Sequence, residues 1–305
     1  MSDVDSPNHR PIDADLVRSL LQEQHPDLAE LDLRHAASGW SHQMWRIGEE
    51  LVVRLPRTED VVLNVLNEQR WLPELVDRFA LPVPVPRRTG GPSERFPWPW
   101  TVTTWVPGEP ADEQPIAQGG PSTEALAHFL RALHRPAPDD APAHPQQRGV
   151  ALSAFVDDIE RGFRDVLGED PAAGALRDIW QDALAAPEWT GPKVWLHGDL
   201  HPANVVVRDG ALAGVIDFGD LCAGDPATDL SAAWLLLPQG EADPFFKTYA
   251  TADEATVRRA RGWTVLRGIG LIGIGRAGDR GLPGGQPTWG TAGRAALDRL
   301  LRTTP

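Results

Sequence analysis

The chain has 305 residues, 41% of them hydrophobic, and a formal net charge of −14 at pH 7. This length and composition are ordinary for a globular protein with a substantial core, and the negative charge argues against nucleic acid, a polyanion, as a partner. A single cysteine, Cys222, excludes an intramolecular disulfide framework, and no apolar run has membrane-spanning length. These features predict a cytoplasmic protein with no nucleic-acid and no membrane partner.

The first third of the chain predicts short strands and one helix. Residues 51–55 (LVVRL) form an apolar, β-branched strand, and apolar positions at helical spacing predict a helix over 61–72. The proline-rich residues 81–100 predict a surface connection, and residues 100–106 (WTVTTWV) a further strand that ends at Pro107. This region therefore predicts a small sheet.

From residue 121 onward the pattern is mainly helical. Ser122 is the expected cap of a helix that runs to His134, and two more helices are expected over 153–167 and 171–186. Six acidic residues lie on or near the last two helices, namely Asp157, Asp158, Glu160, Asp165, Glu169 and Asp170. For any single one of these acids, a solvated helix face is the simplest explanation.

Residues 197–217 contain the residue types that phosphoryl transfer needs. Asp199 and Asn204 lie on a predicted loop, and Asp217 follows a predicted hairpin whose antiparallel strands bring Asn204 and Asp217 together. In phosphoryl transfer, one carboxylate orients the attacking hydroxyl and accepts its proton, while an amide oxygen and a second carboxylate hold magnesium ions. The pattern predicts Asp199 as the catalytic base and Asn204 and Asp217 as Mg²⁺ ligands.

Three motifs in this part of the chain resemble one known family. HGDLHPAN, IDFGD and DPATD, over 197–229, are similar in order and spacing to the aminoglycoside phosphotransferase family, small-molecule relatives of the eukaryotic-type protein kinases. The resemblance covers roughly the whole chain. It implies an α+β, protein-kinase-like fold of two lobes. A nucleotide-binding N-lobe with a small antiparallel sheet would span residues 1–107, and a mainly helical C-lobe residues 108–305.

The resemblance also assigns roles within the C-lobe. It implies the same roles for Asp199, Asn204 and Asp217, and it makes Asp225 and Asp229 an acidic pair that braces the catalytic loop. The helices of the C-lobe, including the carboxy-terminal ones, would form the walls of the acceptor site.

A kinase-like N-lobe further requires a cation on its third strand, paired with a glutamate on the following helix. Lys193 and Lys247 are the only lysines of the chain, so the resemblance places Arg54 at the phosphate-binding position and Glu68 as its partner. Arginine keeps the charge but binds phosphate oxygens through a planar fork. The alternative is that Arg54 is an exposed strand charge.

Two further nucleotide contacts follow from the resemblance. Backbone amides of Ser41 and His42, in a segment with a single glycine, would cradle phosphates, although the segment can equally be an ordinary hairpin turn. Backbone groups of Thr104, Trp105 and Val106, in the hinge between the lobes, would meet the nucleotide base. Trp105 can equally be a core residue.

Other interpretations of the motifs are weaker. His197, Asp199 and His201 match an HxDxH metal cluster of a hydrolase, with Asp217 bridging, but that interpretation leaves Asn204 unexplained. A non-catalytic binding protein on the same fold is disfavoured because all three catalytic positions are occupied. The GxGxxG pattern at 268–273 is not followed by a βαβ unit and indicates close helix packing instead.

The sequence therefore predicts a kinase that transfers the γ-phosphoryl group of ATP or GTP, with Mg²⁺, to a hydroxyl of a small molecule. We expect an antibiotic acceptor, either an aminoglycoside or another basic antibiotic, because a net charge of −14 attracts cations. A metabolite kinase of the choline or homoserine type on the same fold is the alternative.

Overall fold

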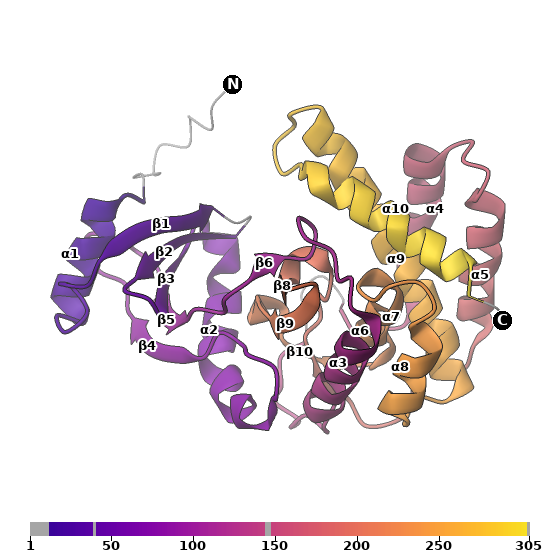
Figure 1. Cartoon of the computed structure of the whole chain (residues 1–305), viewed down its shortest axis with the longest axis horizontal. Coiled ribbons are helices and arrows are strands. Elements are labelled where there is room, and N and C mark those ends of the chain that lie inside the picture. Colours follow the sequence, from indigo (N-terminus) through magenta and orange to yellow (C-terminus); the bar gives the residue numbers. More distant parts are fainter. Residues whose placement is uncertain (1–11, 39–40, 144–147, 304–305) are drawn as a thin grey trace. The chain divides into compact units, whose positions relative to one another are not determined.

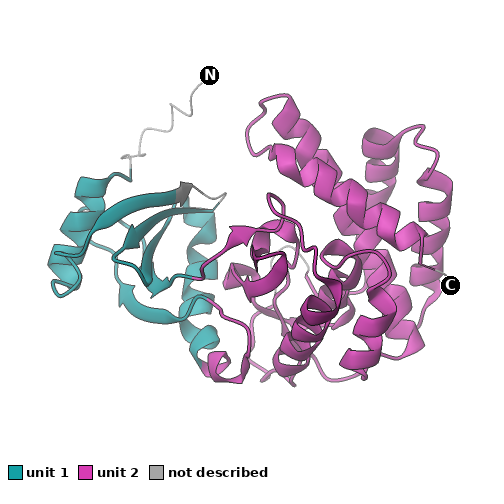
Figure 2. Cartoon of the chain, viewed as in Figure 1, with its two compact units in different colours: residues 1–73, 84–105 teal, residues 74–83, 106–305 magenta. Residues whose placement is uncertain are grey.

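The structure is a computed structural model that describes residues 12–38, 41–143 and 148–303. The chain divides into two compact units (Figure 2). Unit 1 comprises Met1–Pro73 and Pro84–Trp105, and unit 2 comprises Glu74–Val83 and Val106–Pro305. The division therefore falls after Trp105, and ten residues that precede it in the chain belong to unit 2.

Unit 1 contains a five-stranded antiparallel sheet in the order β1-β2-β3-β5-β4 (Figure 1). Its elements are α1 (Ala14–Gln24), β1 (Leu33–Ser38), β2 (His42–Ile47), β3 (Leu51–Pro56), α2 (Val62–Trp71), β4 (Pro86–Gly90) and β5 (Trp100–Thr104). The predicted strand 51–55 and the predicted helix 61–72 are thus both present, as β3 and α2.

The core of unit 1 is built around Trp100, which is fully buried at the start of β5. Val53 and Leu55 of β3 belong to the same apolar cluster, and so does the apolar face of α1. Gln69 attaches α2 to this part of the sheet, because its side-chain amide donates to the Trp100 carbonyl at 3.0 Å. The neighbouring residue, Glu68, is thereby held beside the sheet.

Unit 2 is mainly helical and contains two small sheets, β6-β8-β9 and β10-β7. Its strands are β6 (Glu109–Pro110), β7 (Val194–Leu196), β8 (Val205–Arg208), β9 (Ala211–Val215) and β10 (Cys222–Gly224). Its helices are α3 (Gly119–Leu133), α4 (Val156–Arg161), α5 (Ala173–Ala185), α6 (Ala227–Leu230), α7 (Ala232–Leu235), α8 (Ala242–Tyr249), α9 (Glu254–Asp279) and α10 (Pro287–Leu301). An N-terminal antiparallel sheet followed by a helical region confirms the α+β class.

Two helix predictions need correction. Ser122 is not a helix cap, because α3 already begins at Gly119 and the Ser122 hydroxyl accepts from the Leu212 amide of β9 at 3.0 Å. The helix expected over 153–167 is three short pieces, a 3₁₀ turn, α4 and a π-helical segment over Gly162–Leu167. At Ser122, a tertiary contact thus takes the place of the expected cap.

The GxGxxG pattern lies inside α9, where its first glycine packs against α10. A Cβ at Gly268 would lie 2.6 Å from Leu297, and a Cβ at Gly293 of α10 would lie 2.6 Å from the Gly268 carbonyl oxygen. Close helix packing is therefore confirmed at Gly268, whereas a Cβ at Gly270 would meet no atom within 4 Å and one at Gly273 would make only an ordinary contact. Among the described residues, none of the helices has the length and apolar character required to cross a membrane.

The packing of unit 1 predicts opposite outcomes for two adjacent glycines. A Cβ at Gly90 would lie 1.8 Å from the buried ring of Trp100, whereas a Cβ at Gly91 would meet no atom within 4 Å. We expect Gly90→Ala to lower the unfolding free energy by about 1–3 kcal/mol or more, since the added methyl group would overlap the fully buried Trp100 ring and force the core to rearrange. Thermal denaturation of both variants tests this, with Gly91→Ala as the matched control. Equal melting temperatures for the two variants would contradict the packing described.

Candidate active site

The hairpin β8–β9 brings two of the predicted site residues together. Asp209 and Gly210 form its turn with φ angles of 54° and 77°, the left-handed pair that a tight hairpin requires and that Asp-Gly readily adopts. Val205 pairs with Val215, and the Ile216 amide donates to the Asn204 carbonyl at 2.9 Å. Asn204, before the first strand, is therefore adjacent to Asp217, after the second.

The loop that precedes this hairpin, residues 197–204, is called the HGD loop below. His197 ties it to the end of β9, because its Nε2 donates to the Ile216 carbonyl at 2.9 Å while its Nδ1 accepts from the Asp199 amide at 3.3 Å. The next residue, Asp217, has a φ of 62°, a left-handed conformation that aspartate tolerates better than most residues. His197 thus acts on the backbone beside both acidic residues.

These bonds also bear on the hydrolase interpretation. Both ring nitrogens of His197 are occupied by backbone groups, so this side chain has no nitrogen left to bind a metal. Within the ranges that the structure describes, no group of three or more histidine, cysteine or acidic side chains is arranged to hold a metal ion. His197, the first residue of the HxDxH pattern, therefore stabilises the backbone of the loop.

The buried side chain of Asp229 binds the backbone of the HGD loop. Its carboxylate accepts from the His197 amide at 2.7 Å and the Gly198 amide at 3.0 Å, and it contacts His134 Nε2 at 3.2 Å. Burial raises the pKa of Asp229, but the hydrogen bond and charge of His134 and the Gly198 amide hold it below its ordinary value. The carboxylate is therefore ionised and accepts from two backbone amides.

Asp225 occupies a different place from the one that the resemblance implies. It accepts from Arg259 of α9 at 2.7 Å and from the Ala227 amide at 3.0 Å. The two aspartates of DPATD therefore have separate tasks. Asp229 binds the HGD loop directly, and Asp225 anchors the start of α6 to α9.

Asp199 is surrounded by donors on both carboxylate oxygens. Its Oδ1 accepts from Arg148 at 3.2 Å and from Arg267 of α9, which also donates to the Gly198 carbonyl. Its Oδ2 accepts from the Asn204 amide at 3.2 Å and lies 3.3 Å from His201 Nε2. The side chain still keeps 23% of its surface exposed.

These neighbours decide the charge of Asp199. Burial alone raises its pKa, but Arg267, His201 and Arg148 outweigh that effect and hold the pKa well below the ordinary value. Asp199 is therefore a carboxylate with acceptor capacity only at neutral pH, the form that can orient a hydroxyl. The sequence motifs do not indicate Arg148 and Arg267, because these residues are 51 and 68 positions from Asp199 and belong to no local motif.

The side-chain oxygens at the end of the hairpin are suitable ligands for magnesium. The Asn204 side-chain NH₂ donates to both the backbone carbonyl and the carboxylate of Asp199, at 2.9 and 3.2 Å, which turns the amide oxygen the other way. An amide oxygen and the adjacent Asp217 carboxylate are hard ligands, and Mg²⁺ commonly takes one or two protein oxygens together with phosphates and waters. Asn204 and Asp217 are the residues that would hold it.

Unit 1 carries the candidate nucleotide residues. Arg54 of β3 forms a buried ion pair with Glu68 of α2, with side chains 9% and 5% exposed, so it is not an exposed strand charge. His42 lies near this pair, and burial together with the charge of Arg54 holds its pKa well below the ordinary value. His42 is thus neutral, and its Nδ1 bonds the Ser41 hydroxyl at 2.8 Å. The predicted phosphate loop also includes Gly39 and Trp40, which lie outside the described residues.

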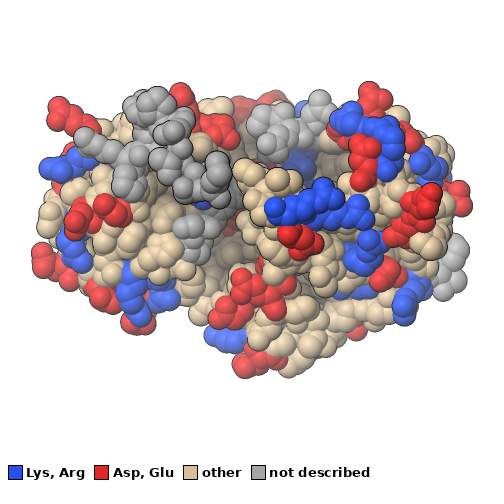
Figure 3. Space-filling model, turned by 90° about the horizontal axis from the view of Figure 1, so that it is seen from above, with Lys and Arg blue, Asp and Glu red and all other residues tan. Residues whose placement is uncertain are grey.

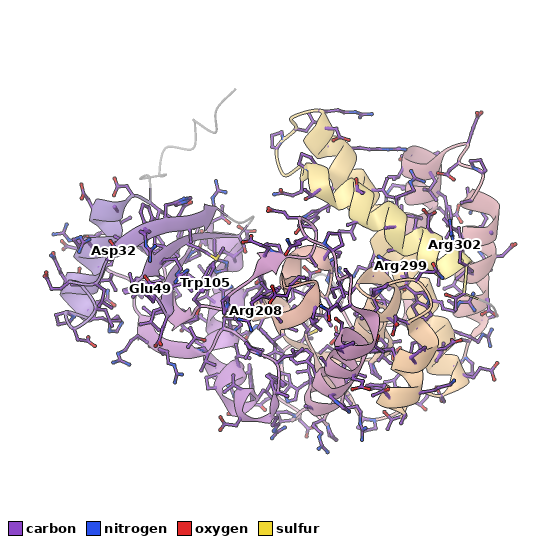
Figure 4. All side chains as sticks on the ribbon, in the orientation of Figure 1. Asp32, Glu49, Trp105, Arg208, Arg299 and Arg302 are labelled. Atoms are coloured by element: carbon purple, nitrogen blue, oxygen red, sulfur yellow. The ribbon has the colours of Figure 1, made fainter. Side chains whose placement is uncertain are left out.

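The predicted hinge is partly occupied by bonds within unit 1. The Thr104 amide donates to the Val85 carbonyl at 3.0 Å, and the Trp105 amide donates to the Glu50 carbonyl at 2.7 Å. The ring of Trp105, labelled in Figure 4, packs 4.6 Å from the Arg46 guanidinium. These two amides are thus already used within the sheet, and Val106 is the first residue after the division between the units.

Comparison with known proteins agrees with the motifs. The model of the phosphotransferase enzyme family, APH, matches residues 32–268. An aminoglycoside 3'-phosphotransferase of Streptomyces fradiae is 32% identical over 182 residues, which are 57% of this chain and 65% of that protein. A homoserine kinase of Acidiphilium cryptum is also 32% identical, over 203 residues that cover 60% of this chain and 61% of the kinase. The matches thus span somewhat less than two thirds of either relative.

Solved structures show the same fold. The GDP complex of aminoglycoside 2'-phosphotransferase-IIIa has a TM-score of 0.62 at 19% identity, covering 93% of this chain and 97% of that one. At this identity, the likeness concerns the fold alone. The family match, which spans most of the chain, shows that the chain belongs to the phosphotransferase enzyme family.

Proposed function

We propose that this enzyme transfers the γ-phosphoryl group of ATP or GTP to a hydroxyl group of a small molecule. The observation that carries the proposal is the convergence of an ionised Asp199, Asn204 and Asp217 at one end of the hairpin β8–β9. Family membership supports the reaction class, and the GDP bound to a structural relative supports a nucleotide donor.

In the proposed reaction, the acceptor hydroxyl oxygen attacks the γ-phosphorus. The bond from that phosphorus to the β–γ bridging oxygen breaks, and the nucleoside diphosphate leaves with the electron pair. Asp199 orients the hydroxyl and accepts its proton. Asn204 and Asp217 would hold magnesium, and the ion would neutralise charge on the phosphate oxygens.

The nucleotide contacts that we propose lie in unit 1 and at its end. Arg54, kept in place by Glu68, contacts phosphate oxygens, and the backbone at Ser41 and His42 approaches the phosphates. Of the hinge residues, Val106 is the best candidate for a base contact, because the amides of Thr104 and Trp105 are bonded within the sheet.

Two acceptor classes follow from the relatives. An antibiotic acceptor, either an aminoglycoside or another basic antibiotic, is supported by the relative from Streptomyces fradiae and by the net charge of −14. A hydroxylated metabolite is supported to the same extent, since a homoserine kinase matches at the same identity. We propose a cytoplasmic location, which suits the unpaired, buried thiol of Cys222. Nucleotide consumption measured against a panel of antibiotics and metabolites tests the reaction and separates the two classes.

Replacing the proposed base should abolish most turnover without unfolding the protein. For Asp199→Asn we expect kcat to fall by roughly 10²- to 10⁴-fold, the usual range for a lost acid–base group, with nucleotide binding retained. Asp209→Asn makes the same change at the hairpin turn, where asparagine suits the left-handed backbone, and should leave kcat unchanged. Near-normal turnover in Asp199→Asn would refute the assignment.

The metal assignment predicts a change in the magnesium dependence of nucleotide binding. Asp217→Asn keeps the left-handed backbone but replaces a charged ligand with a neutral one. Calorimetric titration with the nucleotide should show that Mg²⁺ strengthens binding to the native enzyme and has little effect on this variant. An equal magnesium effect in both proteins would place the metal elsewhere.

Arg54→Lys tests the phosphate contact, since lysine retains the charge but lacks the planar fork. We expect the nucleotide KM to rise roughly tenfold, about 1.4 kcal/mol, with the acceptor KM nearly unchanged. Arg34→Lys is the matched control, because Arg34 pairs with Glu49 on an exposed part of the same sheet. Unaltered nucleotide parameters in Arg54→Lys and Arg54→Ala would show that Arg54 has only a structural role.

A further inference from the structure

The immediate surroundings of Asp199 are rich in arginine. Arg148 and Arg267 both donate to its Oδ1, and Arg148 Nε lies 3.7 Å from the Asp220 carboxylate. Arg148, Arg267, Asp199 and Asp220 keep between 11% and 23% of their side-chain surfaces exposed. Any molecule that presents a hydroxyl to Asp199 therefore also meets two guanidinium groups.

The acidic residues on the predicted acceptor helices do not offset these arginines. Four of the six are already in ion pairs with arginines, as Asp158–Arg161, Glu160–Arg177, Asp165–Arg164 and Asp170–Arg294. The helix that carries Arg267, α9, has five arginines and two acidic residues in a chain whose net charge is −14. Acidic and basic side chains also lie interspersed on the face shown in Figure 3. The net charge of the chain is therefore a poor guide to the charge that an acceptor meets.

The two arginines differ in how firmly they are held. Arg267 has two partners, the Asp199 carboxylate and the Gly198 carbonyl, and its side chain is 11% exposed. Arg148 has a single hydrogen bond to Asp199, at 3.2 Å, and is 20% exposed. Its buried Nε has no hydrogen-bond partner in the described part of the chain. Burial and the nearby charge of Arg267 both lower the pKa of Arg148, so an additional anion would stabilise this guanidinium.

We propose that the acceptor carries a carboxylate close to its reacting hydroxyl and that Arg148 binds this carboxylate. This inference rests on the proposed phosphotransferase reaction at Asp199. The planar fork of a guanidinium matches a carboxylate through two parallel N–H···O bonds, and the Arg148 side chain is 20% exposed beside Asp199. When Arg148 turns to the acceptor, one donor leaves Asp199 Oδ1, and that oxygen becomes available to the hydroxyl proton.

The same geometry disfavours a polycationic acceptor. Ammonium groups placed beside Asp199 would be next to two guanidinium groups and would compete with them for Asp199 and Asp220. The inference therefore favours a hydroxy acid or a hydroxy amino acid over an aminoglycoside. It makes Arg148 a determinant of acceptor specificity.

The test uses acceptors that differ only in the charged group. L-Homoserine and 4-hydroxybutyrate are each compared with their own amide, and kanamycin serves as the polycation, with nucleoside diphosphate formation by the full chain as the readout. We expect kcat/KM for at least one acid to exceed that for its amide by tenfold or more. Arg148→Gln should lower the value for the acid at least tenfold more than the value for the amide, because only the acid offers a carboxylate to Arg148. Arg161→Gln, which removes the same charge from an exposed surface pair, should change neither.

Several outcomes would overturn the inference. These are equal use of an acid and its amide, preference for kanamycin, and an equal loss for all acceptors in Arg148→Gln, which would mean that Arg148 acts on the transferred phosphoryl group. If none of the probes is phosphorylated, saturation-transfer NMR with 4-hydroxybutyrate decides, because the absence of Arg148-dependent binding also refutes the proposal. Arg148→Lys and the melting temperatures show whether a loss comes from misfolding. Failure of the phosphotransferase proposal itself is distinguishable, since nucleotide use would then not depend on Asp199 with any acceptor.

Discussion

The buried Asp229 carboxylate is the interaction on which the candidate site depends. By accepting from the consecutive amides of His197 and Gly198, it fixes the backbone immediately before Asp199. A buried carboxylate must be compensated by several donors, and here two backbone amides and His134 supply that compensation. His197 then extends the same constraint to Ile216, so that the positions of Asp199 and Asp217 both follow from one buried charge.

Local patterns predicted the parts of the site that local geometry determines. The hairpin could be predicted because Asp209-Gly210 requires a tight left-handed turn, and a hairpin necessarily brings Asn204 close to Asp217. The pairing of Arg54 with Glu68 followed from the family resemblance, and the structure contains that ion pair. The α+β class followed in the same way from strands early in the chain and helices later.

Contacts between residues far apart in the chain determine the remaining parts of the site, and no local pattern in the sequence predicts them. Arg148 and Arg267 reach Asp199 from a turn and from a helix that share no motif with it. Serine is a residue type that commonly caps helices, yet the Ser122 hydroxyl accepts a hydrogen bond from the amide of Leu212, 90 residues away. The net charge of −14 suggested a cationic acceptor, whereas the anionic acceptor that we propose rests on the two arginines beside Asp199. Charge summed over a chain describes its solubility better than its binding site.

The most direct test of the central claim is to follow the phosphoryl group itself. Phosphorus-31 NMR of the enzyme with magnesium, ATP or GTP and a mixture of small hydroxylated compounds separates a new phosphate monoester from free orthophosphate. If Asp199 is the base for transfer to an acceptor hydroxyl, a phosphate monoester should form in the same amount as the nucleoside diphosphate. It should be absent when Asp199 is replaced. Release of orthophosphate alone, whichever compound is present, would contradict the account.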